Sequence, residues 1–331
     1  MIIPQLSWVE IDLGNWQTAQ QLLDRLLQRR SYALSPLQLH AVVTQCDLWR
    51  RQGRLEEARQ LLEPLVQSNH FEDKAALGAW TVLAQLYALN QQDTAAVQAL
   101  DQAVAIWQKL GASCDEGLQI ATVIAIYSRA GQTARLQTVI DAIHACPPAA
   151  PDSLAHVFRS NVEGVIALAE QRWHAAATYF SEAIPLFQRI GFVYHEAAAQ
   201  QHLAEAYLRS PAAATHTEAI SSALHTARDT FERLGAPLDL ADVETLIKQH
   251  NLRRPRPASS RTVELTPRET QVIALLARGL SNRAIAEELV ISPKTAEIHV
   301  SNILGKLALS SRAQVAAYAV ELGLLTRTEP D

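Results

Sequence analysis

The 331-residue sequence has little of what marks catalytic, metal-binding or secreted proteins. It contains three scattered cysteines, Cys46, Cys114 and Cys146, and no Cys-x-x-Cys pair, so neither a disulfide framework nor a zinc site is indicated. It has no glycine-rich phosphate-binding loop and no His-Glu-x-x-His motif. Its histidines, His195 and His202 among them, are dispersed over the chain. We therefore predict no metal, no cofactor and no enzymatic activity.

Targeting and membrane signals are also missing. The N-terminal segment MIIPQLSWVEIDLG has no basic flank before its short apolar stretch, so it is not a signal peptide. No uninterrupted apolar run approaches the length that spans a bilayer. A composition of 48% hydrophobic and 19% charged residues is ordinary for a globular protein. These observations predict a cytoplasmic protein without a membrane partner.

The net charge of −5 argues against a nucleic-acid partner for the chain as a whole, but the charges are unevenly distributed along it. Residues 252–331 contain 11 Lys and Arg and 8 Asp and Glu, a balance of +3. The rest of the chain contains 18 and 26, a balance of −8. Because DNA attracts basic and repels acidic surfaces, only the C-terminal part is predicted to approach phosphates.

Residues 1–249 are predicted to form a helical-repeat domain. Strand alternation is almost absent, and aromatic residues recur at Trp49, Tyr87, Tyr127 and Tyr207, a period near 40 residues that predicts six stacked helical hairpins. The segment from Trp80 to Ala103 resembles a tetratricopeptide repeat. The tryptophans at 16, 49, 80, 107 and 173 are predicted to pack between helices rather than to form a ligand cage.

Four short helices with clear start and stop signals are predicted in the C-terminal part. Thr266 and Glu269 form a capping box around Pro267, and Gly279 ends that helix. Ser281 begins the second helix, Ser292-Pro293 begins a third that runs to about residue 307, and a fourth ends at Gly323. A short helix, a tight turn at 290–292 and a longer helix are typical of a helix-turn-helix.

The third of these helices separates into two faces. Ala296, Val300, Ile303 and Leu307 form a buried stripe at helical spacing. The opposite face mixes short polar, charged and β-branched side chains that suit phosphates and base edges in a major groove. This face contains Lys294, Thr295, Glu297, Ile298, Ser301 and Asn302. A solvated face on a small helical bundle is the alternative that the residues alone leave open.

Residues 265–325 resemble, without a gap, the DNA-binding domain of LuxR-type transcription regulators. The resemblance rests on LTPRE at 265–269, LLARGLSN at 275–282, Thr295, His299 and GLL at 323–325. It implies that the helix from 293 to 307 is the recognition helix. The family often has a lysine where Glu297 stands, and a second basic residue where Ser301 stands, so the bases that are read are in question.

The resemblance, together with the face described above, gives the predicted site. Double-stranded DNA is predicted to be bound by Ser281, Asn282, Arg283, Ser292, Lys294, Thr295, Glu297, Ile298, His299, Ser301, Lys306 and Arg312. A homodimer on DNA is predicted to form through small residues of the last helix, where close approach of a symmetric mate is possible. These residues are Ala313, Ala317 and Val320.

The predicted fold is all-α: a tetratricopeptide-like superhelix over residues 1–249, a flexible linker over 250–263 and a four-helix LuxR-type domain over 264–326. This order resembles the C-terminal part of the large ATP-dependent LuxR regulators, which implies that the repeats bind an unknown small-molecule or protein effector, with transcription machinery as a further partner. The ATPase module of that family is not seen, so a fragment or a shortened relative is expected. The alternative is an interaction scaffold whose C-terminal domain mainly dimerises.

Overall fold

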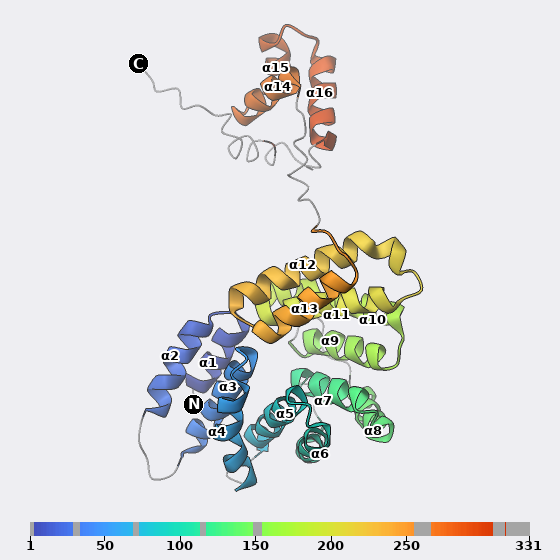
Figure 1. Cartoon of the computed structure of the whole chain (residues 1–331). Helices are drawn as coiled ribbons and strands as arrows, with labels where there is room; N and C mark the ends of the chain where they lie inside the picture. Colours follow the sequence, from blue (N-terminus) through green and yellow to red (C-terminus); the bar gives the residue numbers. More distant parts are fainter. Residues whose placement is uncertain are drawn as a thin grey trace. The chain divides into compact units, whose positions relative to one another are not determined.

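The computed structural model describes residues 3–28, 34–68, 73–112, 117–147, 154–254, 266–306 and 315. Regular structure in these residues is entirely helical, which confirms the all-α prediction. The chain divides into two compact units, Met1–Arg254 and Pro255–Asp331 (Figure 1). None of the described helices combines the length and apolarity needed to cross a bilayer.

The first unit is built from consecutive helix pairs followed by one further helix. Its helices are α1 (Ile3–Asp12), α2 (Trp16–Leu27), α3 (Pro36–Arg51), α4 (Leu55–Gln67), α5 (Asp73–Leu89), α6 (Asp93–Lys109), α7 (Gly117–Arg129), α8 (Thr133–His144), α9 (Leu154–Ala169), α10 (Trp173–Ile190), α11 (Val193–Arg209), the short 3-10 helix η2 (Ala213–His216), α12 (Thr217–Leu234) and α13 (Pro237–Gln249). The described helices from α1 to α12 thus form six hairpins, the number predicted from the sequence.

Each of the first five hairpins turns at a residue with left-handed backbone. These residues are Gly14, Gly53, Gln91, Gly131 and Gln171, which lie 38 to 40 residues apart. The spacing agrees with the repeat period predicted from the aromatic residues. In the third hairpin the left-handed residue is Gln91, with φ of 59°. A left-handed conformation favours glycine, so the two glutamines carry a modest conformational cost.

Small and aromatic residues hold successive helices together as the sequence predicts. Ala19, Ala58 and Ala96, each five residues after a turn, are fully buried. In the fifth hairpin Ala176 holds this position. One member of the aromatic series also bonds to the preceding hairpin. The Tyr127 hydroxyl on α7 donates to the Asp101 carboxylate on α6 at 2.8 Å. Burial is the main reason why the pKa of Tyr127 lies above its usual range, and the Asp101 carboxylate raises that pKa further.

The first hairpin packs against the last one, which the sequence did not predict. One buried cluster joins residues of α1, α2 and α3 to residues of α11, α12 and α13. At Gly14 a Cβ atom would lie 3.0 Å from a Leu234 methyl, and at Gly53 it would lie 2.9 Å from the Pro237 ring. The two ends of the repeat array therefore cover each other's apolar faces.

The predicted linker differs from the structure over its first residues. The Ser221 hydroxyl on α12 donates to the Arg253 carbonyl at 2.6 Å, and Arg254 pairs with Asp229. Leu252 packs against the same cluster that joins the two ends of the array. Residues 250–254 thus belong to the repeat unit. The Arg253 carbonyl, the Arg254 guanidinium and the Leu252 side chain all contact it. Residues 255–265 lie outside the described part of the chain.

The described helices of the second unit are α14 (Pro267–Ala277), α15 (Asn282–Glu288) and α16 (Pro293–Lys306). Their apolar faces meet in one core that includes Val272, Ile273, Ile285, Ala296 and Ile303. Ala296, Val300 and Ile303 are buried, as the predicted stripe requires. The predicted fourth helix falls outside the described residues except at Val315, which is helical and buried in this core.

Candidate functional site

The helices of the second unit begin at the residues that the sequence indicated. Thr266 and Glu269 form the capping box: the Glu269 amide donates to the Thr266 hydroxyl at 3.2 Å, and the Thr266 amide donates to the Glu269 carboxylate at 2.8 Å. Ser281 caps α15 by accepting from the Ala284 amide at 3.2 Å. Ser292 accepts from the Thr295 amide at 3.0 Å. These side chains satisfy amides that the first turn of a helix leaves unpaired.

Removing the first cap is expected to weaken the domain measurably. Thr266→Ala should destabilise α14 by about 1 kcal/mol, because the Glu269 amide loses its partner. Thr270→Ala serves as the control, since its hydroxyl donates only to the Thr266 carbonyl one turn away. Hydrogen exchange of the α14 amides in the full chain measures both variants. Equal protection in the two variants would show that the cap does not limit the stability of α14.

The turn between α15 and α16 is held by a second set of contacts. Val290 adopts a left-handed backbone with φ of 53° and is 91% exposed. A β-branched residue rarely adopts this conformation. Arg268 on α14 donates to the Leu289 carbonyl at 2.8 Å, which fixes the end of α15. The exposed Val290 was not among the predicted site residues, since valine in a turn gives no sign of its exposure.

Five of the twelve predicted DNA-binding residues have described side chains on α16, namely Lys294, Thr295, Glu297, Ile298 and His299. Lys294, Glu297, Ile298 and Asn302 are exposed, whereas Thr295 and His299 are half-buried at the border of this exposed face. Ile298 is 51% exposed, although a large apolar side chain usually packs into a core. Ser301 and Lys306 lie within α16, but their side chains are outside the described part of the structure.

Two ion pairs set the charge of this surface. The Lys294 ammonium lies 2.9 Å from the Glu297 carboxylate on α16. The Arg283 guanidinium lies 3.2 Å from the Glu287 carboxylate on α15. Both pairs are largely exposed, so solvent weakens them and a phosphate can compete for the basic partner. Glu297 therefore reduces the positive charge that the recognition helix offers.

The remaining predicted residues are placed as follows. Ser281 and Arg283 are exposed at the start of α15, and Asn282 is half-buried beside them. Ser292 is exposed, and its hydroxyl lies 2.7 Å from the Thr295 hydroxyl. Arg312 and the predicted dimer residues Ala313, Ala317 and Val320 lie outside the described part of the chain. The described residues thus bring the start of α15 and the exposed face of α16 together in one small domain.

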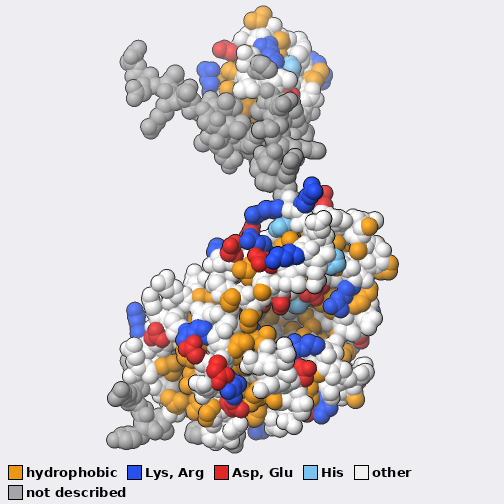
Figure 2. Space-filling model, viewed as in Figure 1, with side chains coloured by type: hydrophobic (Ala, Val, Ile, Leu, Met, Phe, Trp, Pro, Cys, Tyr) orange, Lys and Arg blue, Asp and Glu red, His pale blue; other side chains and the backbone are white. Residues whose placement is uncertain are grey.

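A second candidate site is a cavity of about 280 Å³ inside the repeat unit. It is lined by the first helix of every hairpin, α1, α3, α5, α7, α9 and α11. Figure 2 shows the repeat unit hollowed near its centre, where hydrophobic, basic and acidic side chains lie together. No group of three or more His, Cys, Asp or Glu side chains able to hold a metal is present in the described parts of the chain.

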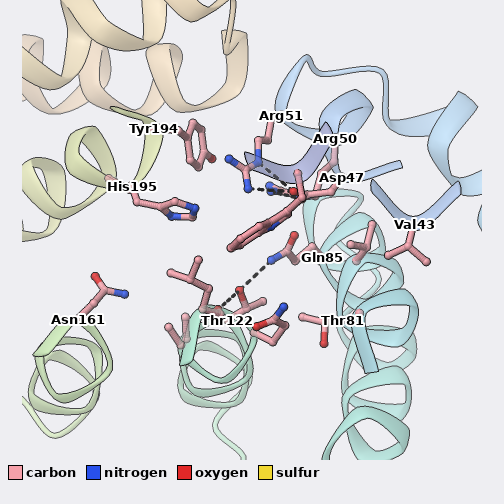
Figure 3. Close-up of a pocket in the computed structure, with 18 of the residues that line it drawn as sticks. Val43, Asp47, Arg50, Arg51, Thr81, Gln85, Thr122, Asn161, Tyr194 and His195 are labelled. Carbon is pink, nitrogen blue, oxygen red and sulfur yellow. Dashed lines mark hydrogen bonds and ion pairs between the residues drawn. The ribbon is translucent and has the colours of Figure 1, made fainter. Parts of the chain in front are cut away.

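Charged side chains of α3 lie along one wall of this cavity (Figure 3). Arg50 and Arg51 on α3 both pair with Asp47, at 2.7 Å and 2.9 Å. The Arg51 guanidinium also lies 3.4 Å from the Asp12 carboxylate on α1. The same carboxylate lies within hydrogen-bonding distance, 3.0 Å, of Nε2 of His195 on α11. Burial acts to raise the pKa of Asp47, but Arg51 and Arg50 hold it well below the usual range.

Sequence reasoning missed most of the cavity wall. His195 and His202, which looked like dispersed residues, both line the cavity from α11. Trp8 lines it from α1, whereas Trp16 and Trp107 are buried in the core as predicted. The missed residues lie on six different helices, and no spacing along the chain relates them. One available signal was the cluster of charged residues near the end of the first helix of the second hairpin, Asp47, Arg50 and Arg51.

Comparison with known proteins identifies the second unit. Residues 263–319 match the family model described as bacterial regulatory proteins, luxR family. The chain is 48% identical over 62 residues to the transcriptional regulatory protein LnrK and 49% identical over 55 residues to LiaR, both of Bacillus subtilis strain 168. It is 38% identical over 80 residues to the nitrate/nitrite response regulator protein NarL of Escherichia coli K12.

These likenesses are confined to a short part of each chain. They cover 19%, 17% and 24% of this chain and 28%, 26% and 37% of the three relatives. The chain therefore spans well under half the length of the curated relatives it matches. Among solved structures, BtubC from P. vanneervenii has a TM-score of 0.38 and 15% identity, covering 75% of this chain and 94% of that chain, a likeness too weak to carry an argument. Residues 263–319 are a LuxR-type helix-turn-helix domain, joined to a body of stacked helical hairpins.

Proposed function

We propose that this protein is a cytoplasmic bacterial transcription regulator that binds duplex DNA, with α16 in the major groove. The observation that carries the proposal is the exposed face of α16, which presents polar, charged and apolar side chains from a helix whose other face is buried. A helix held in this way can enter the major groove as a rigid unit. The match to the luxR family model supports the same function.

Within this proposal the described side chains have separate roles. Arg283 and Lys294, together with Lys306 and Arg312, contact phosphates and set affinity. Glu297, Ile298 and Ser301 set base preference: a carboxylate accepts from a cytosine amino group, and an aliphatic side chain contacts a thymine methyl. Binding as a homodimer through Ala313, Ala317 and Val320 would compensate for the small positive charge of one domain. The repeat unit binds an effector or a protein partner, and transcription machinery is a further partner.

Salt dependence tests the proposal directly. Affinity of the full-length protein for duplex DNA should fall steeply with salt, with a slope of about −0.9 for each neutralised phosphate. Lys294→Ala should reduce that slope by about one per subunit. Fluorescence anisotropy of a labelled random-sequence duplex, titrated at several salt concentrations, gives both values.

The matched control is Lys248→Ala, which removes an exposed lysine from α13 of the repeat unit. This variant should leave the slope unchanged. Affinity that does not vary with salt would remove DNA binding as the function. A slope that changes equally in the two variants would exclude α16 as the phosphate-binding helix. Selection of bound sequences from a random DNA pool then identifies the operator.

A further inference from the structure

The cavity of the repeat unit has the size of a small-molecule site. Its volume of about 280 Å³ corresponds to roughly nine water molecules at their volume in the liquid. Six helices from all six hairpins contribute to its wall, so the repeat array surrounds it. A space of this size suits a molecule of one or two fused rings.

The charged side chains that line the cavity already form ion pairs with neighbouring residues. The guanidinium groups of Arg50 and Arg51 pair with Asp47, and Arg51 also faces Asp12. The Tyr194 hydroxyl donates to Asp239 at 3.0 Å, and the Arg51 guanidinium lies 4.3 Å from the centre of the Tyr194 ring. A charged ligand would have to break these pairs or remain unpaired, and both outcomes are costly in a buried site. The cavity therefore favours an uncharged ligand.

One amide in the wall has hydrogen-bonding capacity that the described residues do not use. Gln85 on α5 donates through Nε2 to the Thr122 hydroxyl on α7 at 2.8 Å. The Thr122 hydroxyl also donates to the Leu118 carbonyl at 3.3 Å, which agrees with its accepting from Gln85. The Gln85 Oε1 is buried and has no hydrogen-bond partner, which leaves a buried acceptor that a ligand donor would satisfy.

Further polar and apolar groups complete the wall. Asn161 points into the cavity from α9, so its amide offers a donor and an acceptor (Figure 3). His202 on α11 also lines the cavity, and its Nδ1 lies 3.9 Å from the Glu205 carboxylate. Trp8 and Val165 supply apolar contact for a ring face. Carboxamide side chains are well suited to a heterocycle edge that carries a donor beside an acceptor, as in the pairing of Asn or Gln with adenine.

We propose that the cavity binds a small uncharged heterocycle with an adjacent donor and acceptor, of the nucleobase or heterocyclic-amide class. The donor of the ligand meets Gln85 Oε1, its polar edge meets Asn161, and its ring face lies against the apolar wall. This inference deepens the proposed function, because it assigns the chemistry of the effector that the repeat unit would take.

Saturation-transfer NMR on the full-length protein tests the proposal with adenine, uracil and nicotinamide at millimolar concentration. At least one of these probes should bind, and nicotinate, in which a carboxylate replaces the amide of nicotinamide, should not. Gln85→Leu and Asn161→Leu should each weaken binding of that probe by about tenfold, since each leaves a polar group of the ligand unpaired. Gln60→Leu, the same substitution on the exposed side of α4, should leave binding unchanged.

Three results would overturn the assignment: no binding of any neutral probe, stronger binding of nicotinate than of nicotinamide, or unchanged binding in both cavity variants. Circular dichroism of each variant, matched to the unsubstituted protein, ensures that a loss reflects the cavity and not unfolding. DNA binding is measured on the same preparations. DNA binding without probe binding contradicts only this inference, whereas probe binding without DNA binding contradicts only the proposed function.

Discussion

Replacing Arg51 with methionine is expected to destabilise the repeat unit by about 3–5 kcal/mol. Arg51 is 5% exposed and pairs with Asp47, and it faces Asp12, which is fully buried. Its loss leaves buried Asp12 with His195, and half-buried Asp47 with Arg50, as ion-pair partners among the described residues, and a buried charge that loses a partner costs more than the net value of the pair. The guanidinium also lies over the Tyr194 ring, so α3, α1 and α11 all lose a contact.

Urea unfolding followed by circular dichroism measures this effect. The control is Arg54→Met, since Arg54 pairs with Glu57 at a half-exposed position of the same hairpin and should lose under about 1 kcal/mol. Adding Asp12→Leu to Arg51→Met is expected to restore part of the stability, because the carboxylate that lost its partner is removed. If Arg51→Met is no less stable than Arg54→Met, the junction between the two ends of the array does not depend on these charges.

Glu297→Lys is expected to strengthen binding to random-sequence DNA by about tenfold to a hundredfold at low salt. The substitution removes a carboxylate that lies 2.9 Å from Lys294 and adds a second cation on the same helix. One more phosphate can then be neutralised per subunit, Lys294 no longer has a competing carboxylate, and a dimer doubles the gain. The selected DNA sequence should also change, because the side chain that accepts from a base is replaced by a donor.

Anisotropy titrations at several salt concentrations measure this gain, and the salt slope should steepen with it. Glu288→Lys is the matched control: it makes the same change of charge at an exposed position of α15. It should increase affinity less, since it leaves the Lys294 pair intact. An equal increase in the two variants would mean that total charge, and not the exposed face of α16, governs binding. A selected sequence that stays the same would show that Glu297 does not face the bases.

The C-terminal domain was largely predictable because its signals are local. A capping box, a serine cap and a glycine stop each act within one helical turn, and the structure has them at Thr266, Ser281 and Gly279. The buried stripe of α16 follows from helical periodicity, since Ala296, Val300 and Ile303 lie on one side of the helix. Side-chain pairing was not predictable: Lys294 and Glu297 were placed on one face, but not as partners.

In the repeat unit the sequence determined the hairpins, and the tertiary structure determined what they enclose. Glycines and alanines at a period near 40 residues specify turns and close packing between neighbouring helices, because these constraints act over short stretches of chain. Whether the array stays open or meets its own end depends on small rotations summed over six hairpins, which no local pattern encodes. Asp12 and His195 are 183 positions apart and 3.0 Å apart in space. Only that closure brings the first helices of six hairpins around a single cavity, in which one amide oxygen has no hydrogen-bond partner among the described residues.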